Sequence, residues 1–193
     1  MQLDQQSKLS RTTISLHWLV GLLIIGLLGS GVYMVETKAY GTYDWHKSFG
    51  VLVLIFVIPR VLWRLRNGWP QPVASHKRYE QTLARCVHWT LIIGMCLMPL
   101  SGFLMSAMSG SGVSFFGMNL IGENNPSGEP GEFVPHNEFL SETFHFMHTT
   151  LSKIMIIAVI LHVVGALKHH IVDRDGTLRR MLGEEIRFDQ SQR

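Results

Sequence analysis

Long runs of hydrophobic residues alternate with polar segments along the chain, and four of these runs have the length of a membrane span. They cover residues 14–35, 46–66, 85–107 and 147–170. About 20 apolar residues in a helix cross the hydrocarbon core of a bilayer. The pattern therefore predicts an all-α fold, a four-transmembrane-helix bundle. We interpret residues 1–193 as a single integral membrane domain.

Composition agrees with this interpretation. Hydrophobic residues make up 47% of the chain and charged residues only 16%, against about 25% in soluble domains. The first apolar run follows a polar stretch and has no cleavage-site pattern, so we expect a retained span and not a signal peptide. A basic patch with interleaved aromatic residues is absent, and we expect no nucleic-acid partner.

The distribution of Lys and Arg predicts the orientation. With four spans, both termini and the connection 67–84 share one side, and the positive-inside rule places the more basic side in the cytoplasm. The other side, with only Lys38, Lys47 and Lys153, would be periplasmic. Fourteen of the seventeen cations belong to the cytoplasmic side: Lys8, Arg11, Arg60, Arg64, Arg66, Lys77, Arg78, Arg85, Lys168, Arg174, Arg179, Arg180, Arg187 and Arg193.

The longest connection, about residues 108–146 between the third and fourth helices, is expected in the periplasm. Its segment GENNPSGEPGEFVPHNEF is rich in Gly, Pro and Asn, which disfavour regular structure. We expect Phe115, Phe116 and Phe133 to pack it over the helix ends. It has no Lys or Arg and forms an acidic cap with five glutamates: Glu123, Glu129, Glu132, Glu138 and Glu142.

Four histidines fall at two depths of the predicted bundle. His148 and His162 are fourteen residues apart, which on a helix is about 21 Å along the axis and within roughly 40° of one face. His46 opens the second span at the level of His148, and His17 lies in the first span at the level of His162. An ionisable residue inside a span is by default a candidate functional residue. The ordinary alternative is that His148 marks the interface and His162 is a hydrogen-bonded polar residue between helices.

Two imidazoles on facing helices are what six-coordinate haem iron requires. Two pairs would hold two haems, one near each membrane face, and would carry electrons across the bilayer. The residues four positions after the histidines are all small and leave room for a flat ring, although small residues also serve helix packing. They are Gly21, Gly50, Ser152 and Ala166.

Arg60 lies fourteen residues after His46 and thus at the inner level. A buried arginine needs a partner, and a haem propionate would supply one; the alternative is that Arg60 snorkels to the surface. A zinc or copper site is disfavoured because the four histidines do not converge and no carboxylate or cysteine accompanies them. Cys86 and Cys96 are ten residues apart on one helix and cannot bridge each other. The chain has no C-x-x-C-H motif for covalent haem attachment.

Several motifs make the chain resemble the bacterial four-helix cytochrome b561 proteins over about residues 10–183. They are R-x-x-x-S-x-H-W-L at 11–19, H-x-S-x-G at 46–50, P-R-V-L-W-R-L at 59–65, the His148–His162 spacing, and L-K-H-H with D-x-T-L-R-R-M at 167–181. The resemblance implies an inner-membrane protein with two non-covalent b haems ligated by His17, His46, His148 and His162. It also implies electron exchange with ubiquinone. His88 and His169 lie near the inner face and are candidate contacts; the alternative, which we favour, is that both are ordinary interfacial histidines. One branch of the family oxidises superoxide.

The outer charges do not favour superoxide as the donor. Seven carboxylates, Glu36, Asp44 and the five glutamates of the acidic cap, face three lysines, a balance of −4. A basic surface would attract this anion and an acidic one repels it. The sequence thus predicts a di-haem cytochrome that moves electrons between a periplasmic donor, superoxide or a redox protein, and ubiquinone. Two alternatives stay open: a membrane-anchor cytochrome subunit without activity of its own, and a haem-free bundle.

Overall fold

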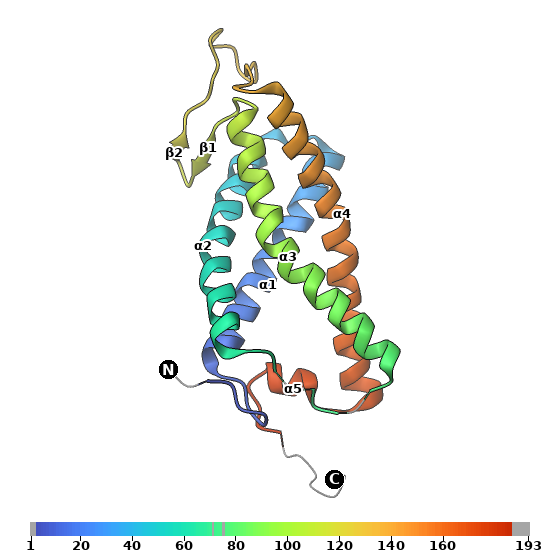
Figure 1. Cartoon of the computed structure of the whole chain (residues 1–193). Coiled ribbons are helices and arrows are strands. Elements are labelled where there is room, and N and C mark those ends of the chain that lie inside the picture. Colours follow the sequence, from blue (N-terminus) through green and yellow to red (C-terminus); the bar gives the residue numbers. More distant parts are fainter. Residues whose placement is uncertain (1–2, 71, 75, 187–193) are drawn as a thin grey trace, which may run out of the picture.

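Four long helices form a bundle in the computed structural model (Figure 1), which describes residues 3–70, 72–74 and 76–186. The helices are α1 (Arg11–Thr37), α2 (Tyr43–Asn67), α3 (Arg78–Met108) and α4 (Glu138–Lys168). All four are long and apolar enough to cross a membrane. The predicted all-α fold with four membrane-spanning helices is confirmed.

The helices extend beyond the apolar runs, and polar side chains cap the starts of α1 and α4. The Oγ of Ser10 accepts a hydrogen bond from the backbone N–H of Thr13 (3.2 Å) at the start of α1. The Oδ1 of Asn137 accepts one from the N–H of Leu140 (3.0 Å) at the start of α4. Such caps satisfy N–H groups that have no partner inside the helix. These two helices thus begin at capping residues and not at the edge of the apolar run.

Large apolar side chains remain exposed along the outside of the bundle. Leu22 on α1 is 61% exposed, Ile58 on α2 60% and Ile157 on α4 60%. An apolar surface of this extent marks contact with lipid or another partner. Together with the length of the helices, it agrees with a bundle whose outer surface faces the acyl chains.

The middle of the bundle has an apolar core. Val20 from α1, Val53 and Val57 from α2, and Met95 from α3 form one buried cluster. α3 packs along α4 over most of its length, whereas α1 and α4 approach each other only locally. The three helices α1, α2 and α3 therefore meet in the centre, while α4 is held mainly by α3.

The seam between α3 and α4 depends on a glycine. Met155 of α4 is 1% exposed and lies against Gly94 of α3, where a Cβ would overlap the Met155 Sδ. Met155 is seven residues from both His148 and His162. The absence of a side chain at residue 94 thus lets α4 approach α3 midway between the two histidines.

The connection between α3 and α4 contains a short antiparallel hairpin, β1 (Val113–Phe115) and β2 (Met118–Ile121). The hairpin lies against α2 (Figure 1), where Lys47 Nζ donates to the carbonyl oxygens of Ser111 (3.0 Å) and Gly112 (3.1 Å). The ring of Phe116 packs edge-on against Phe49 of α2, with centroids 5.4 Å apart. The expectation that this connection packs over the helix ends is confirmed for Phe116. The Gly- and Pro-rich segment that follows β2 forms only turns and bends up to α4.

The opposite end of the bundle gathers the rest of the chain. A π-helical turn, η2 (His169–Asp173), continues α4 and leads to the short helix α5 (Thr177–Met181). Trp18 Nε1 of α1 donates to the carbonyl of Met181 (2.9 Å), and Arg180 Nη1 donates to the carbonyl of Gln6 (3.0 Å). The N-terminal and C-terminal segments therefore meet at one end, opposite the hairpin (Figure 1).

Candidate functional site: two imidazole pairs

The structure brings the four predicted histidines together as two pairs. At the end of the bundle that carries the hairpin, the ring of His46 on α2 faces that of His148 on α4, with centroids 6.4 Å apart and planes at 88°. Toward the other end, His17 on α1 and His162 on α4 have centroids 6.0 Å apart and planes at 51°. We call these the outer and the inner pair. The pairing follows the depths that the sequence indicated.

The outer ring of His46 is held by a serine on the neighbouring helix. Ser30 Oγ lies 2.9 Å from His46 Nδ1 and donates its own hydrogen to the carbonyl of Leu27 (3.0 Å). Because the hydroxyl hydrogen is already used, the serine oxygen accepts from an Nδ1–H. This fixes the tautomer and leaves the lone pair of Nε2 available to a ligand.

His148 is oriented in the same way by α3. Its Nδ1 lies 3.0 Å from the carbonyl of Met98 and 3.2 Å from Ser101 Oγ, which donates to that carbonyl at 2.8 Å. A carbonyl only accepts, so Nδ1 again carries the hydrogen and Nε2 the lone pair. Gly102 makes room for the ring: a Cβ at this position would lie 2.7 Å from His148 Cε1.

The inner pair has a third imidazole and a cation beside it. The ring of His88 on α3 lies 5.3 Å from that of His162. Arg60 Nη1 donates to the carbonyl of Leu16 (2.8 Å), and its Nη2 lies 3.1 Å from His17 Nδ1. Arg60 therefore turns into the bundle at the inner level and does not extend toward the surface.

The sequence indicated His88 as a candidate quinone contact near the inner membrane face, and its contact with His162 was not foreseen. The one available signal was spacing along α3: His88 precedes Ser101, which contacts the outer pair, by thirteen residues. That separation is about 20 Å along a helix, close to the distance between the two levels. His169, the other candidate quinone contact, lies away from this pair and contacts His76 and Asp173.

The surroundings of the pairs leave space for a flat group. A Cβ added to Gly21 or to Gly50, one turn from His17 and His46, would meet no atom within 4 Å outside its own stretch of helix. The helix that carries His148 and His162 has little close backbone contact with α1 and α2, which carry their partners. Among the described residues, neither pair belongs to a group of three or more converging His, Cys, Asp or Glu ligands. The geometry thus fits a ring between two imidazoles better than a compact metal site.

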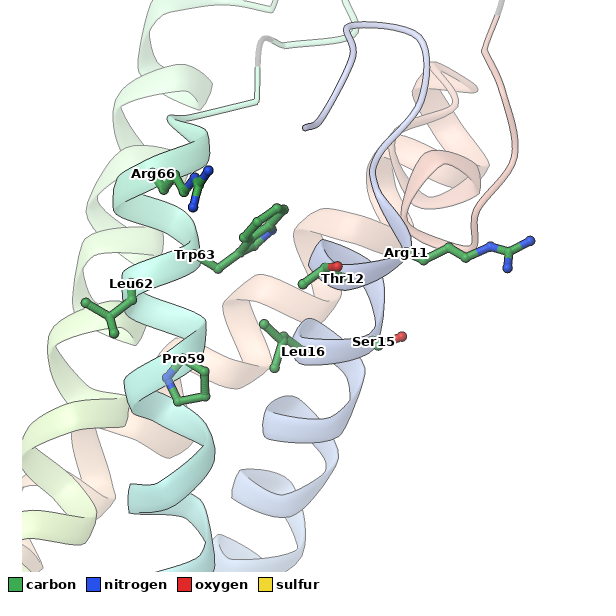
Figure 2. A pocket seen from close by; sticks show the side chains of 8 residues that line it. All are labelled: Arg11, Thr12, Ser15, Leu16, Pro59, Leu62, Trp63 and Arg66. Atoms are coloured by element: carbon green, nitrogen blue, oxygen red, sulfur yellow. The ribbon is translucent and has the colours of Figure 1, made fainter. Parts of the chain in front are cut away.

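An open groove of about 660 Å³ lies between the start of α1 and the end of α2, at the end of the bundle opposite the hairpin (Figure 2). We call this the basic end because most of the described Lys and Arg residues lie there. Trp63 and Leu16 point into the space between the two helices, and Arg11 points away from α2. Pro59 and Leu62 line its α2 side. No histidine lines the groove, which is therefore distinct from both pairs.

The fold and the paired imidazoles define a class of membrane proteins: four-helix bundles that hold a redox cofactor between their helices. A family model described as prokaryotic cytochrome b561 matches residues 8–184. The chain belongs to this family, and membership implies binding of b-type haem and a role in electron transport.

Curated relatives agree over most of their length. "Cytochrome b561 homolog 2" of Escherichia coli (strain K12) is 30% identical over 174 residues, 87% of each chain. "Probable superoxide oxidase CybB" of Yersinia pestis is 28% identical over 179 residues, 91% of this chain and 96% of that one. "Cytochrome b561 homolog 1" of Escherichia coli (strain K12) is 26% identical over 182 residues, 91% and 97% of the two chains.

Proposed function

We propose that this protein carries two b haems, one between the imidazoles of each pair, and transfers single electrons across the bacterial inner membrane between a periplasmic donor and ubiquinone. The observation that carries the proposal is the presence of two facing imidazole pairs at opposite ends of one bundle. When bound, haem iron supplies reversible one-electron chemistry, and the protein supplies ligands, spacing and electrostatics.

The separation of the rings supports ligation of one iron by each pair. A metal-bound imidazole nitrogen lies about 2 Å from its metal, so two rings on opposite sides of one atom have centroids about 6 Å apart. The outer pair is at 6.4 Å and the inner pair at 6.0 Å. The Nδ1 hydrogen bonds of His46 and His148 hold both rings with Nε2 available as the ligand atom.

In this proposal Arg60 changes its partner when haem binds. An iron-bound imidazole donates from its free N–H and cannot accept from a guanidinium. Ligation of His17 through Nε2 would therefore end the contact between Arg60 and His17 Nδ1. The freed guanidinium would pair with a propionate, a charge-assisted contact that suits arginine.

The identity of the donor follows less directly. A relative named probable superoxide oxidase makes superoxide one candidate. Lys47 would be part of any attracting patch near the outer pair, but its ammonium group is bound to the carbonyls of Ser111 and Gly112. The acidic connection around it favours a cationic partner, so a basic periplasmic redox protein is the second candidate. In that case the chain would act as a membrane-anchor cytochrome subunit without activity alone.

The proposal is tested by counting haems. We expect a pyridine haemochrome assay on purified, detergent-solubilised protein to give two b haems per chain. His148→Ala should lose the outer haem and His162→Ala the inner one, so each variant should retain about one. His136→Ala, an exposed histidine of the connection, is the matched control and should retain both.

Two results would contradict this assignment. A single haem in the unaltered protein would mean that only one pair binds iron. Retention of two haems by His162→Ala would mean that His88, the neighbouring imidazole, is the inner ligand. The donor is tested separately by reduction of the purified protein with enzymatically generated superoxide, in the presence and absence of superoxide dismutase.

A further inference from the structure

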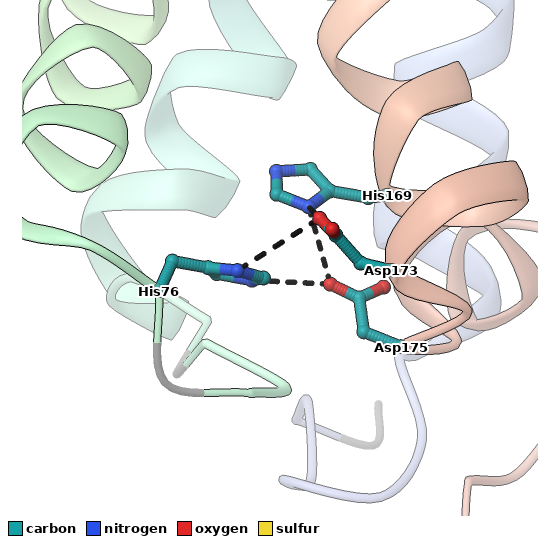
Figure 3. A group of neighbouring side chains, drawn as sticks. All are labelled: His76, His169, Asp173 and Asp175. Carbon is teal, nitrogen blue, oxygen red and sulfur yellow. Dashed lines mark hydrogen bonds and ion pairs between the residues drawn. The ribbon is translucent and has the colours of Figure 1, made fainter.

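A cluster of four potential metal ligands lies at the end of the bundle opposite the hairpin, outside both imidazole pairs (Figure 3). His76 comes from the connection between α2 and α3, His169 and Asp173 come from η2, and Asp175 follows η2. One ligand atom from each lies within 4.8 Å of all the others. Figure 3 shows His76 facing the other three across the gap between the two segments.

Three of the separations between ligand atoms are close to those of a tetrahedral coordination shell. With zinc–nitrogen and zinc–oxygen bonds of about 2.0–2.2 Å, ligand atoms in a tetrahedron lie about 3.3 Å apart. In the structure, His76 Nε2 is 3.1 Å from Asp175 Oδ2, and His169 Nδ1 is 3.3 Å from the same oxygen. His169 Nδ1 is 2.8 Å from Asp173 Oδ2. These three separations are close to the tetrahedral value, and the four ligand atoms all lie within 4.8 Å of one another.

Asp175 provides an independent sign that a ligand is missing. Its side chain is 2% exposed, and its Oδ2 makes no hydrogen bond although two imidazole nitrogens face it. The other oxygen, Oδ1, accepts from the backbone N–H of Thr177 (2.8 Å), which fixes the direction of Oδ2. A buried carboxylate oxygen without a donor is costly. A cation among the four side chains would remove that cost.

The charges around the cluster favour a divalent cation. Asp173, Asp175 and Glu80 contribute three negative charges. Lys168 bridges Glu80 (3.1 Å) and Asp173 (2.9 Å), and the positive charge of Arg180 interacts with Asp4 and, more weakly, with Asp175. With neutral imidazoles, the charges of the three carboxylates, Lys168 and Arg180 add up to −1 before a metal binds. Lys168 can keep its contact with Glu80 when a metal takes the Asp173 oxygen.

We propose that His76, His169, Asp173 and Asp175 form a binding site for a divalent transition metal, Zn²⁺ by its donor atoms and spacing. Two imidazoles with two carboxylates suit zinc, whereas Mg²⁺ and Ca²⁺ prefer all-oxygen shells. The bound ion would tie the connection between α2 and α3 to the C-terminal continuation of α4. It would thereby hold the basic end of the bundle together independently of the haems.

The test uses the full-length, haem-loaded protein in detergent, purified without a polyhistidine tag and treated with a chelator. Zn²⁺ is titrated against a chromophoric zinc indicator. We expect one tight site per chain, and an affinity reduced at least about 30-fold by His76→Ala and by Asp175→Asn. Neither residue belongs to the proposed haem sites. His170→Ala, an exposed histidine beside His169, is the matched control and should bind zinc as the unaltered protein does.

X-ray absorption at the zinc edge, which haem iron does not obscure, should report four nitrogen or oxygen ligands including two imidazoles. No tight site in the unaltered protein would overturn the proposal. So would equal losses in His170→Ala and His76→Ala, because zinc would then sit on surface histidines. Haem content measured on the same samples shows whether a variant is folded, and the zinc result stands whether or not the haem assignment is correct.

Discussion

At the scale of the residue, the orientation of each outer imidazole depends on a serine whose hydroxyl hydrogen is already donated to a backbone carbonyl. Ser30 and Ser101 each donate to a carbonyl of their own helix and so can only accept from the ring nitrogen. Serine at these positions therefore acts on the tautomer as well as on the position of the ring. The sequence showed the histidines but not these partners, because both serines lie on other helices, sixteen and forty-seven residues away.

Gly102 offers a direct test of the outer site. In Gly102→Ala the new Cβ would lie 2.7 Å from His148 Cε1, so the ring must move out of its place. We expect at least a twofold loss of outer haem, or a shifted outer spectrum, with the inner haem unchanged. Low-temperature reduced-minus-oxidised spectra would resolve the signals of the outer and the inner haem. Gly29→Ala on α1, where a Cβ meets nothing within 4 Å, should have no effect; equal losses in both variants would contradict the argument.

Arg60 should act on the inner site alone. A nearby positive charge favours the reduced, more negative haem, so Arg60→Gln should lower the midpoint potential of the inner haem. A drop on the order of 60 mV corresponds to a tenfold change for a one-electron couple. Potentiometric titration measures both haems in one sample. Arg11→Gln removes an arginine that points away from α2 (Figure 2) and should leave both potentials in place; a shift of the outer haem by Arg60→Gln would contradict the assignment.

At the scale of the element, the helices were predictable from the length of the apolar runs. The depths of the histidines followed from their positions along those runs and the rise of a helix per residue. The hairpin in the third connection was not foreseen, because its strands have three and four residues and depend on contacts with α2. The contact of His88 with His162 and the cluster around His76 were missed for a related reason. Each joins elements far apart in the sequence, and only packing decides which faces meet.

The seam between α3 and α4 predicts a stability effect. Met155→Ala should leave a cavity against Gly94 and cost about 2–5 kcal/mol of unfolding free energy, seen as a lower thermal midpoint by circular dichroism in detergent. Ile157→Ala, on the same helix but 60% exposed, should change the midpoint little. Similar midpoints for the two variants would mean that Met155 does not stabilise the packing of α3 against α4.

At the scale of the whole molecule, the described N-terminal and C-terminal segments meet at one end of the bundle (Figure 1), which agrees with an even number of spans and does not give their direction. That direction depends on the Lys and Arg distribution. We expect a green fluorescent protein fused to the C-terminus to fluoresce in bacterial cells, and alkaline phosphatase inserted after Ser127 to be active. The reverse pattern of the two reporters would place the termini in the periplasm.

The apolar cluster of Val20, Val53, Val57 and Met95 has a consequence for energy conversion. It fills the centre of the bundle with three valines, which neither donate nor accept hydrogen bonds, and with one thioether, which is only a weak acceptor. Protons and hydrated ions thus find no relay through this cluster, whereas an electron would tunnel between the two proposed haems on either side of it. The electron would cross without a compensating ion. The membrane potential would therefore raise or lower the free energy of each crossing by about 2.3 kcal/mol per 100 mV. The same valines that stabilise the bundle would make its turnover sensitive to voltage.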